Sequence, residues 1–194
     1  MIKMIVGLGN PTKKYIDTRH NIGFRFINIL SFCGIKSNGH SLKCNDFKYS
    51  DDFVAMIGTI ELKDNQLILV KPQTFMNYSG VSVQLLAKHY NIKPEEILVV
   101  HDEIHVKLGK CKLKFGGSAG GNNGLKSIIE KIGDQFWRLR IGIDKPENTN
   151  LLDYVLSEPN FEDKHSLDTL LFSIVFGDIN SLLNNQDKFQ REFH

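Results

Sequence analysis

One histidine, His20, lies where a stretch of polar residues runs into a helical pattern, and a histidine in that place can act as a general base. The stretch reads Asn10-Pro11-Thr12-Lys13-Lys14-Tyr15-Ile16-Asp17-Thr18-Arg19-His20-Asn21. The N-terminus of a helix disfavours the imidazolium form, so this position predicts a neutral His20 that can accept a proton. A surface turn followed by a helix with a threonine cap is an equally good interpretation of these residues alone.

Three polar residues follow apolar runs that predict strands. Asn10 follows the run Met4–Val6, Asn77 follows a run that ends near Lys71, and Asp102 follows the run Ile97–His101. Open α/β sheets bind ligands at the carboxyl ends of their parallel strands. If the three strands are parallel, these side chains converge on one candidate site.

Strand-like apolar runs alternate with segments whose apolar residues recur every three or four positions, as in helices. The strand-like runs are Met4–Val6, Ala55–Leu62, Gln66–Val70, Ile97–Val100, Lys110–Phe115 and Trp137–Ile143, and the helical patterns are Ile22–Cys33, Val83–Tyr90, Leu125–Ile132 and Leu167–Val175. This alternation predicts an α/β fold in which residues 1–194 form a single domain, with a mixed, mostly parallel twisted sheet and helices on both faces.

Two segments refine this expectation. The runs on either side of Lys63-Asp64-Asn65 predict a hairpin, which makes the sheet mixed. The segment Ser37–Asp52 is polar and has no period, so it predicts a loop or a frayed edge.

The charge of the chain is balanced overall but uneven along its length. The 194 residues carry a formal net charge of +2, which argues against a disordered chain and against a uniformly basic protein. Lys107 to Lys145 holds nine basic and three acidic residues, whereas Pro146 to His194 holds three basic and nine acidic residues. The basic stretch predicts a surface that can bind a polyanion.

The compartment can be inferred from what the sequence lacks. No apolar run approaches the roughly 20 residues that span a bilayer, and the N-terminal residues do not resemble a signal peptide. The three cysteines lack CxxC pairing, which argues against a disulfide framework and a zinc ribbon. We expect a soluble, cytoplasmic protein with reduced thiols and no membrane partner.

Two motifs begin like known binding sites and then depart from them. Gly7-Leu8-Gly9-Asn10-Pro11-Thr12 starts like a dinucleotide fingerprint, but Thr12 replaces the last glycine and Pro11 interrupts the turn. His101-Asp102-Glu103-Ile104-His105 superficially resembles a zinc helix. Its glutamate is misplaced, and a strand would set the two histidines about 13 Å apart. Both nucleotide and metal binding are therefore disfavoured, and no GxSxG elbow predicts a serine nucleophile.

A glycine-rich segment precedes the third helical pattern. It reads Gly116-Gly117-Ser118-Ala119-Gly120-Gly121-Asn122-Asn123-Gly124-Leu125-Lys126. A flexible linker would have this composition, but linkers rarely lead straight into an amphipathic helix. Loops that approach a ligand with their backbone often do.

Five ordered motifs of this chain resemble those of bacterial-type peptidyl-tRNA hydrolases, over nearly the whole length. The motifs are GLGNP, NPxxYxxTRHNIGF, KPQTFMNYSG, the segment Val100-His101-Asp102-Glu103, and GGSAGGxNGLKSI. The resemblance implies an enzyme that cleaves the ester between a peptide and the terminal ribose of tRNA, with peptidyl-tRNA as its partner. It also implies a monomer without a cofactor, and the residue spacing above favours no metal.

The resemblance also implies roles for individual residues. His20 matches the catalytic histidine and Asp102 the acidic residue that orients it. The other matched positions are the substrate-binding residues Asn10, Tyr15, Met76, Asn77 and Asn123, and the tRNA phosphate-binding pair Lys114 and Arg140. Two positions depart from the family pattern: Asn122 stands where a histidine is usual, and Thr12 stands where glycine commonly follows Asn-Pro.

The residue chemistry agrees with this assignment. If Asp102 accepts one ring N–H of His20, the other ring nitrogen can take a proton from water near neutral pH. Asparagine amides can donate hydrogen bonds to a developing oxyanion without carrying charge. Two other functions stay open at this point: a homologue that binds RNA without turnover, which a hydrolysis assay would reveal, and a nucleotide-dependent oxidoreductase, which a cofactor titration would reveal.

Overall fold

The centre of the molecule is a seven-stranded mixed sheet. The computed structural model describes residues 1–37, 40–45, 47–62, 65–145 and 149–192. The strands, in the spatial order β4-β5-β6-β1-β7-β9-β8, are Lys48–Ser50, Ala55–Glu61, Gln66–Pro72, Met4–Gly7, Ile97–Glu103, Trp137–Gly142 and Cys111–Phe115. The four central strands β6, β1, β7 and β9 are parallel, and β4, β5 and β8 pair antiparallel at the edges. The predicted fold class is confirmed.

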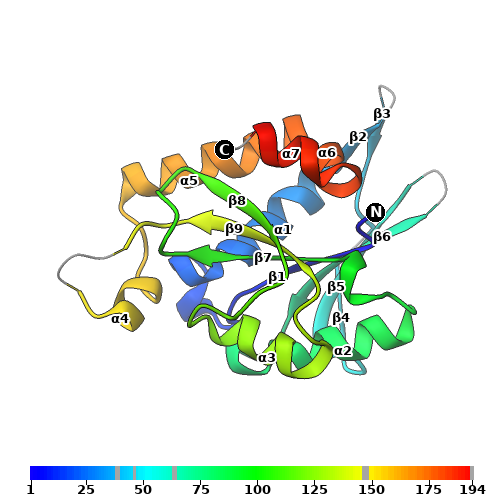
Figure 1. Ribbon diagram of the computed structural model, residues 1–194, viewed down its shortest axis with the longest axis horizontal. Coiled ribbons are helices and arrows are strands. Elements are labelled where there is room, and N and C mark those ends of the chain that lie inside the picture. The colour runs from blue at the N-terminus through cyan, green and yellow to red at the C-terminus, as the bar shows by residue number, and fades with distance from the viewer. Residues whose placement is uncertain (38–39, 46, 63–64, 146–148, 193–194) are drawn as a thin grey trace.

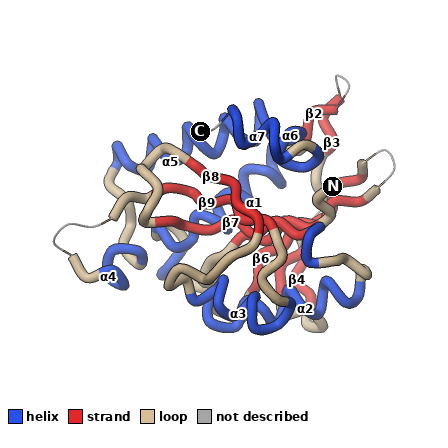
Figure 2. Tube along the Cα trace, viewed as in Figure 1, coloured by secondary structure: helices blue, strands red, loops and turns tan. Residues whose placement is uncertain are grey.

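Helices cover both faces of this sheet (Figure 1). One face carries α1 (Ile22–Cys33), α5 (Phe161–Ser173), α6 (Ile179–Asn184) and α7 (Gln186–Glu192), and the other carries α2 (Ser79–His89) and α3 (Asn123–Ile132). Figure 2 shows the strands in red between these two layers of blue helix. The short helix α4 (Leu151–Val155) lies apart from both layers, near the carboxyl ends of the parallel strands.

The helical stretch Phe161–Asn184 owes its apolar composition to the core. Its 24 residues are long and apolar enough to cross a membrane by length and composition alone. However, Leu167, Leu171, Ile174 and Leu182 are buried against the sheet, in the same cluster as residues of α1. The packing therefore accounts for the hydrophobicity of this segment.

Two glycines let α1 pack directly against strand backbone. A Cβ atom on Gly23 would lie 2.3 Å from the Leu8 backbone nitrogen and 2.4 Å from the Val100 carbonyl oxygen. A Cβ atom on Gly7 would lie 2.2 Å from the carbonyl oxygen of Gly23. Only glycine fits at such distances, so the start of α1 is held against the ends of β1 and β7. This contact explains why glycines occur in the GLGNP and HNIGF motifs.

The prediction of a loop or frayed edge over Ser37–Asp52 was wrong in part. Strands β2 (Ile35–Ser37) and β3 (His40–Leu42) form a separate antiparallel pair, and β4 adds to the edge of the main sheet. Main-chain hydrogen bonds define such short strands, so they need no alternation of apolar side chains. Residues 38–39 and 46 lie outside the described residues. The hairpin of β5 and β6 is confirmed, and Lys63-Asp64 in its predicted turn also lies outside them.

Candidate active site

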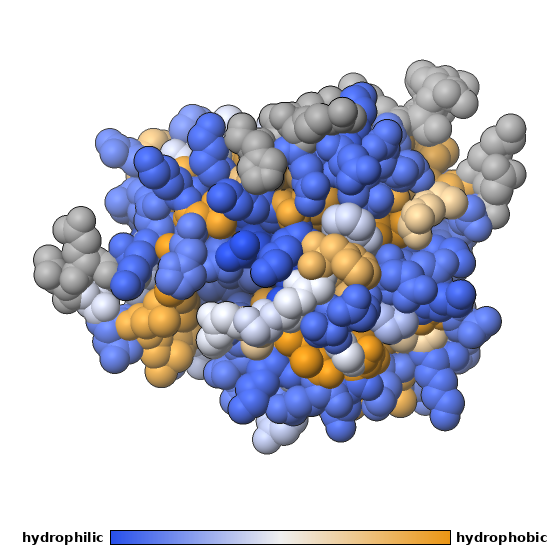
Figure 3. Space-filling view, viewed as in Figure 1, coloured by the Kyte–Doolittle hydropathy of each residue, from blue (hydrophilic) through white to orange (hydrophobic). Residues whose placement is uncertain are grey.

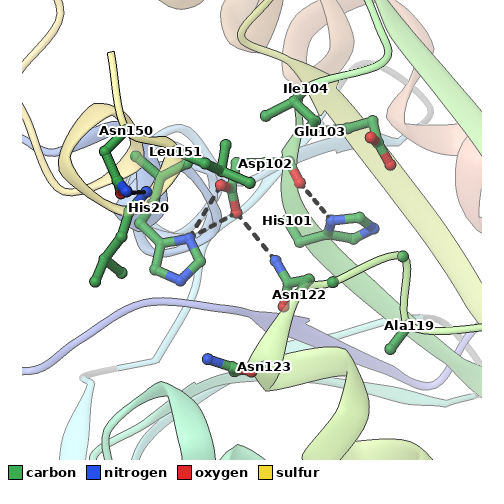
Figure 4. Close-up of a pocket in the computed structure, with 14 residues that line it drawn as sticks. His20, His101, Asp102, Glu103, Ile104, Ala119, Asn122, Asn123, Asn150 and Leu151 are labelled. Carbon is green, nitrogen blue, oxygen red and sulfur yellow. Dashed lines mark hydrogen bonds and ion pairs between the residues drawn. The ribbon is translucent and has the colours of Figure 1, made fainter. Parts of the chain in front are cut away.

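The carboxylate of Asp102 meets the imidazole of His20 at the carboxyl end of β7. The Nδ1 atom of His20 lies 3.0 Å from both Oδ1 and Oδ2 of Asp102 (Figure 4). His20 belongs to a 3₁₀ turn, Arg19–Asn21, that leads into α1, and the close packing of α1 on the sheet brings this turn to Asp102. The side chains of His20 and Asp102 are only 13% and 5% exposed.

Asn122 supplies a second donor to the same carboxylate. Its Nδ2 atom donates to Oδ1 of Asp102 at 3.2 Å, and its Oδ1 atom accepts a hydrogen bond from the Leu125 backbone N–H at 3.1 Å. Asn122 is therefore the N-cap of α3 and also a partner of Asp102. The glycine-rich segment delivers it there: Gly120 and Gly121 have φ of +57° and +86°, a region that favours glycine.

The ion pair changes the protonation behaviour of both partners. Burial, the largest influence, lowers the pKa of His20, but the charge of Asp102 and its hydrogen bond outweigh burial, so the pKa lies above the ordinary 6.5. Burial raises the pKa of Asp102, but the charge and hydrogen bond of His20 outweigh it and hold that pKa below its usual range. The sequence analysis expected the helix N-terminus to disfavour the imidazolium form of His20, whereas in the structure the net shift of the His20 pKa is upward. Asp102 has the larger effect.

His101 stiffens the end of β7 from the opposite side. Its Nδ1 atom donates to the backbone carbonyl oxygen of Asp102 at 2.7 Å, and the side chain is buried. Burial lowers the pKa of His101 and keeps the ring neutral. Its Nε2 atom has no hydrogen-bond partner among the described residues.

Asn10 ties the loop after β1 to two neighbouring segments. Its backbone N–H donates to Oδ1 of Asn21 at 2.8 Å, and Nδ2 of Asn21 donates back to the Asn10 carbonyl oxygen at 3.0 Å. The Asn10 Oδ1 atom accepts from the Met76 backbone N–H at 2.9 Å. Met76 is buried and packs over Gly124, so this network connects the ends of β1 and β6 with the start of α3.

A hollow of about 360 Å³ opens above the ion pair, and we call it the His20 hollow. It is lined by His20, His101, Asp102, Glu103, Ile104, Ala119, Gly120, Gly121, Asn122, Asn123, Asn150, Leu151, Leu152 and Val155. The α4 residues Leu151 and Leu152 form its apolar wall and are 46% and 60% exposed. Figure 3 shows this wall as an orange patch where Figure 1 places α4.

Of the predicted substrate-binding residues, Asn123 lines the His20 hollow, whereas Asn10, Tyr15, Met76 and Asn77 are not among its lining residues. Asn77 is exposed and lines a neighbouring hollow of about 240 Å³, and Asn123 lines both this one and the His20 hollow. Asn10 lines a third hollow of about 330 Å³ on the other side of the Asn10–Asn21 loop. Tyr15 is half-buried in the 3₁₀ helix Lys13–Tyr15 of that loop. The strands β6, β1 and β7 are parallel, so Asn10, Asn77 and Asp102 all follow or end strands at the same carboxyl edge, as expected from the sequence, but each lines a different hollow.

The predicted phosphate-binding pair lies on β8 and β9. Lys114 is opposite Arg138 in the antiparallel register, and the next pair on the same face is Lys112 with Arg140. Lys114 is exposed, whereas Nε and Nη2 of Arg140 donate to Oε2 of Glu103 at 2.9 and 2.8 Å. Arg138 is buried, and its Nη atoms donate to the carbonyl oxygens of Gly117 and Ser118, so the exposed cations of this face are Lys112 and Lys114.

The comparisons with known proteins agree with this geometry. A profile of the peptidyl-tRNA hydrolase family matches residues 4–194. This chain belongs to the peptidyl-tRNA hydrolase family. A peptidyl-tRNA hydrolase of Neisseria meningitidis serogroup C is 46% identical over 169 residues, covering 86% of this chain and 83% of the relative. One from Persephonella marina is 45% identical over 173 residues, covering 88% and 86%.

A solved structure supports the same conclusion. The crystal structure of peptidyl-tRNA hydrolase from Acinetobacter baumannii matches with a TM-score of 0.87 and 34% sequence identity, over 98% of this chain and 93% of that chain. The resemblance inferred from the five motifs is thus confirmed at the level of the family, the fold and the hydrolase activity.

Several residues of this peptidyl-tRNA hydrolase site were not predicted from the sequence. Asn122 had been noted only as a departure from the family pattern, and the structure places it on Asp102. Asn21 and Arg19 flank His20 in the same motif, and this adjacency was the available signal. No sequence pattern indicated that α4 would form a wall of the site, because its short apolar run is like that of many surface helices. Among the described residues, no three or more His, Cys, Asp or Glu side chains group closely enough to hold a metal ion.

Proposed function

We propose that His20 is the general base with which this peptidyl-tRNA hydrolase activates water, and that Asp102 orients it. The observation that carries the proposal is the 3.0 Å contact between His20 Nδ1 and the Asp102 carboxylate. A carboxylate can only accept, so Nδ1 donates and Nε2 is left with its lone pair. Nε2 has no hydrogen-bond partner among the described residues, and His20 lines the hollow, so a water there can approach Nε2.

The reaction then proceeds in two steps, attack of water on the ester and collapse of the resulting oxyanion. Nε2 of His20 takes a proton from water while the water oxygen attacks the ester carbonyl carbon, which gives a tetrahedral oxyanion. As the oxyanion collapses, the bond to the ribose oxygen breaks and that oxygen takes the proton from Nε2. The products are a peptide with a free carboxyl group and a tRNA with a free terminal ribose. The Nδ2 group of Asn123, which lines the His20 hollow, is the proposed neutral donor to the oxyanion, and Asn10 is proposed to bind substrate.

The remaining predicted residues are proposed to bind the two halves of the substrate. Tyr15 and Met76 contact the peptide side, Asn77 binds substrate near the reacting carbonyl, and Lys114 and Arg140 hold a phosphate of the tRNA. The support for the second assignment is that both cations lie on one face of adjacent strands. We further propose that residues 1–194 act as one domain, as a cytoplasmic monomer without a membrane partner or a cofactor.

A hydrolysis assay with matched variants tests this mechanism. Release of tRNA from an N-blocked aminoacyl-tRNA is measured for the natural protein, for His20→Ala and for His165→Ala, which removes an exposed histidine on α5. We expect His20→Ala to lose about 10²-fold or more in kcat with tRNA affinity within a few fold, because a base on water contributes little to binding. His165→Ala should match the natural protein.

Two results would contradict the proposal. Substantial turnover by His20→Ala would exclude His20 as the base. A natural protein that binds tRNA but does not release it would favour the homologue that binds RNA without turnover.

A further inference from the structure

Arg19, the residue immediately before His20, is buried in a dense set of contacts. It is 7% exposed. Its Nη1 atom donates to Oγ of Ser157 at 2.9 Å and to the carbonyl oxygen of Glu158 at 3.0 Å, and Nη2 lies 3.2 Å from Oδ2 of Asp163. The Arg19 backbone N–H also donates to the Ser157 carbonyl oxygen, at 3.2 Å. All these acceptors are more than a hundred residues away in the chain, between the end of α4 and the first turn of α5.

The same guanidinium also packs on α4 itself. Its carbon Cζ lies 4.3 Å from the ring centroid of Tyr154, whose hydroxyl donates to the Ile143 carbonyl oxygen at 2.5 Å. Tyr154 belongs to α4, and its neighbours Leu151, Leu152 and Val155 form the wall of the His20 hollow. One side chain thus connects the turn that carries His20 with the α4 wall of the site.

An arginine suits this position because of its shape and charge. Its planar fork reaches several acceptors at once, whereas a lysine ammonium at the same place would leave some of them without a donor. Burying a cation is costly, and the Nη atoms of Arg19 offset that cost through their hydrogen bonds, whereas its buried Nε atom has no partner among the described residues. The contacts of the Nη atoms therefore rigidify the segments that supply the acceptors. Arg25 offers a contrast on the same side of α1: it forms an ion pair with Asp168 of α5 at 2.5 Å, and none of its described contacts involves α4.

We propose that Arg19 is a positioning residue for hydrolysis, which fixes the spacing between His20 and the α4 wall of the His20 hollow. The inference rests on the proposed role of His20. Without Arg19, the 3₁₀ turn and α4 lose their shared anchor, and His20 departs from its placement on Asp102. Small displacements of reacting groups reduce the rate of chemistry strongly. The proposed phosphate-binding residues Lys114 and Arg140 make none of these contacts with Arg19, so tRNA binding is largely retained.

Steady-state kinetics of Arg19→Lys and Arg19→Gln, with Arg25→Gln as the matched control, test the proposal. We expect kcat of both Arg19 variants to fall by tenfold or more while KM for an N-blocked aminoacyl-tRNA stays within threefold. Arg25→Gln, which removes an ion pair of the same class to the same helix, should stay within twofold in both parameters. All assays are run well below the melting temperature of every variant.

A spectroscopic readout separates positioning from general stability. The Nδ1 proton of His20, bonded to Asp102, gives a low-field proton resonance that is assigned by its absence in His20→Ala. This resonance should weaken or disappear through solvent exchange in the Arg19 variants and persist in Arg25→Gln. If Arg19→Gln does not fold, Ser157→Ala and Asp163→Asn, which each remove one acceptor of the guanidinium, should give smaller losses of kcat and of the resonance.

Failure of this proposal is distinguishable from failure of the proposed mechanism. An Arg19→Gln protein with natural kcat and resonance, beside an inactive His20→Ala, would overturn only the role of Arg19. Equal losses of kcat in Arg19→Gln and Arg25→Gln, with the resonance intact in both, would make Arg19 a structural residue and likewise overturn it. Turnover by His20→Ala would overturn both.

Discussion

His20 and Asn122 donate to the same oxygen of Asp102. The Nδ1 atom of His20 and the Nδ2 atom of Asn122 lie 3.0 and 3.2 Å from Oδ1. The two donors come from different sides of the sheet, His20 from the turn before α1 and Asn122 from the start of α3. Because an amide does not titrate, the donor group of Asn122 is the same at every pH, and His20 is the donor whose charge can change.

The first prediction concerns Asn122→His, which restores the residue usual in the family. An imidazole can also donate to Asp102, and the glycines before it leave room, since a Cβ atom on Gly120 or Gly121 would meet nothing within 4 Å. We therefore expect kcat/KM to change by less than tenfold, on the order of 1.4 kcal/mol or below. The pH profile of the natural protein should show one dominant ionisation on its acid side.

The control for this prediction is Asn122→Ala, which removes the donor altogether and should reduce turnover more than Asn122→His does. If the natural protein is nearly inactive and Asn122→His raises turnover by orders of magnitude, the missing histidine was catalytic. The interpretation of this chain as an RNA-binding homologue without turnover would then be the better one.

The second prediction is that Asp102→Asn moves the acid limb of the pH profile to lower pH. A base must be neutral, so kcat/KM of the natural protein rises as pH increases through the His20 pKa, which lies above 6.5. Without the Asp102 charge, burial is the remaining influence, and it lowers that pKa. The limb should therefore shift downward while the plateau falls at least tenfold.

Glu103→Gln is the matched control for that shift. It removes the neighbouring carboxylate of β7, whose charge is not among the causes of the His20 shift, so the limb should stay in place. A short ester substrate avoids any effect through tRNA binding. An unmoved or raised limb in Asp102→Asn would show that Asp102 does not set the protonation of His20.

Much of the fold could be predicted because burial leaves a local signature in the sequence. The central strand β7 is buried over Ile97–Asp102, and a strand enclosed on both faces reads as a continuous apolar run. The α3 pattern Leu125, Ile128 and Ile129 likewise follows from one buried helical face. By contrast, β2 and β3 are defined by main-chain pairing, for which the side-chain pattern carried no signal.

The residues of the candidate site could be predicted from the sequence only where they lie within a family motif. His20, Asp102 and Asn123 lie within motifs and line one hollow. Contacts such as Arg19 with Asp163, which are 144 residues apart, depend on how distant segments pack, and no local pattern encodes that choice. The same is true of the pairing of Arg140 with Glu103, which joins two residues 37 positions apart on neighbouring strands.

The third prediction is that Gly23→Ala destabilises the protein and also disturbs the site. Its Cβ atom would clash with backbone atoms of Leu8 and Val100, which cannot rotate away. We expect the free energy of unfolding to fall by about 1–3 kcal/mol. Gly177→Ala is the control, since a Cβ atom there would meet nothing within 4 Å, and it should be neutral or stabilise by up to about 1 kcal/mol. Urea unfolding measures both, and equal effects would contradict the close-packing argument.

The fourth prediction separates the tRNA surface from the catalytic centre. Lys114→Ala and Arg140→Ala should weaken binding of full-length peptidyl-tRNA much more than binding of a minimal substrate that lacks the phosphate. Each should also flatten the salt dependence of binding by about one unit, because one fewer counterion is released. Lys88→Ala, an exposed lysine on α2, is the control and should leave both substrates unaffected.

The ion pair of Arg140 sharpens this test. The Nε and Nη2 atoms of Arg140 donate to Oε2 of Glu103 at 2.9 and 2.8 Å in the free protein. A phosphate that binds Arg140 therefore has to compete with the Glu103 carboxylate. Glu103→Gln should therefore strengthen binding of the full-length substrate and leave binding of the minimal substrate unchanged. Lys114 is exposed and lies on the neighbouring strand, so a phosphate can bind it without displacing a carboxylate. Equal losses on both substrates in the Lys114 and Arg140 variants would mean that these cations support the fold or the active site, and the basic face would no longer explain how tRNA is bound.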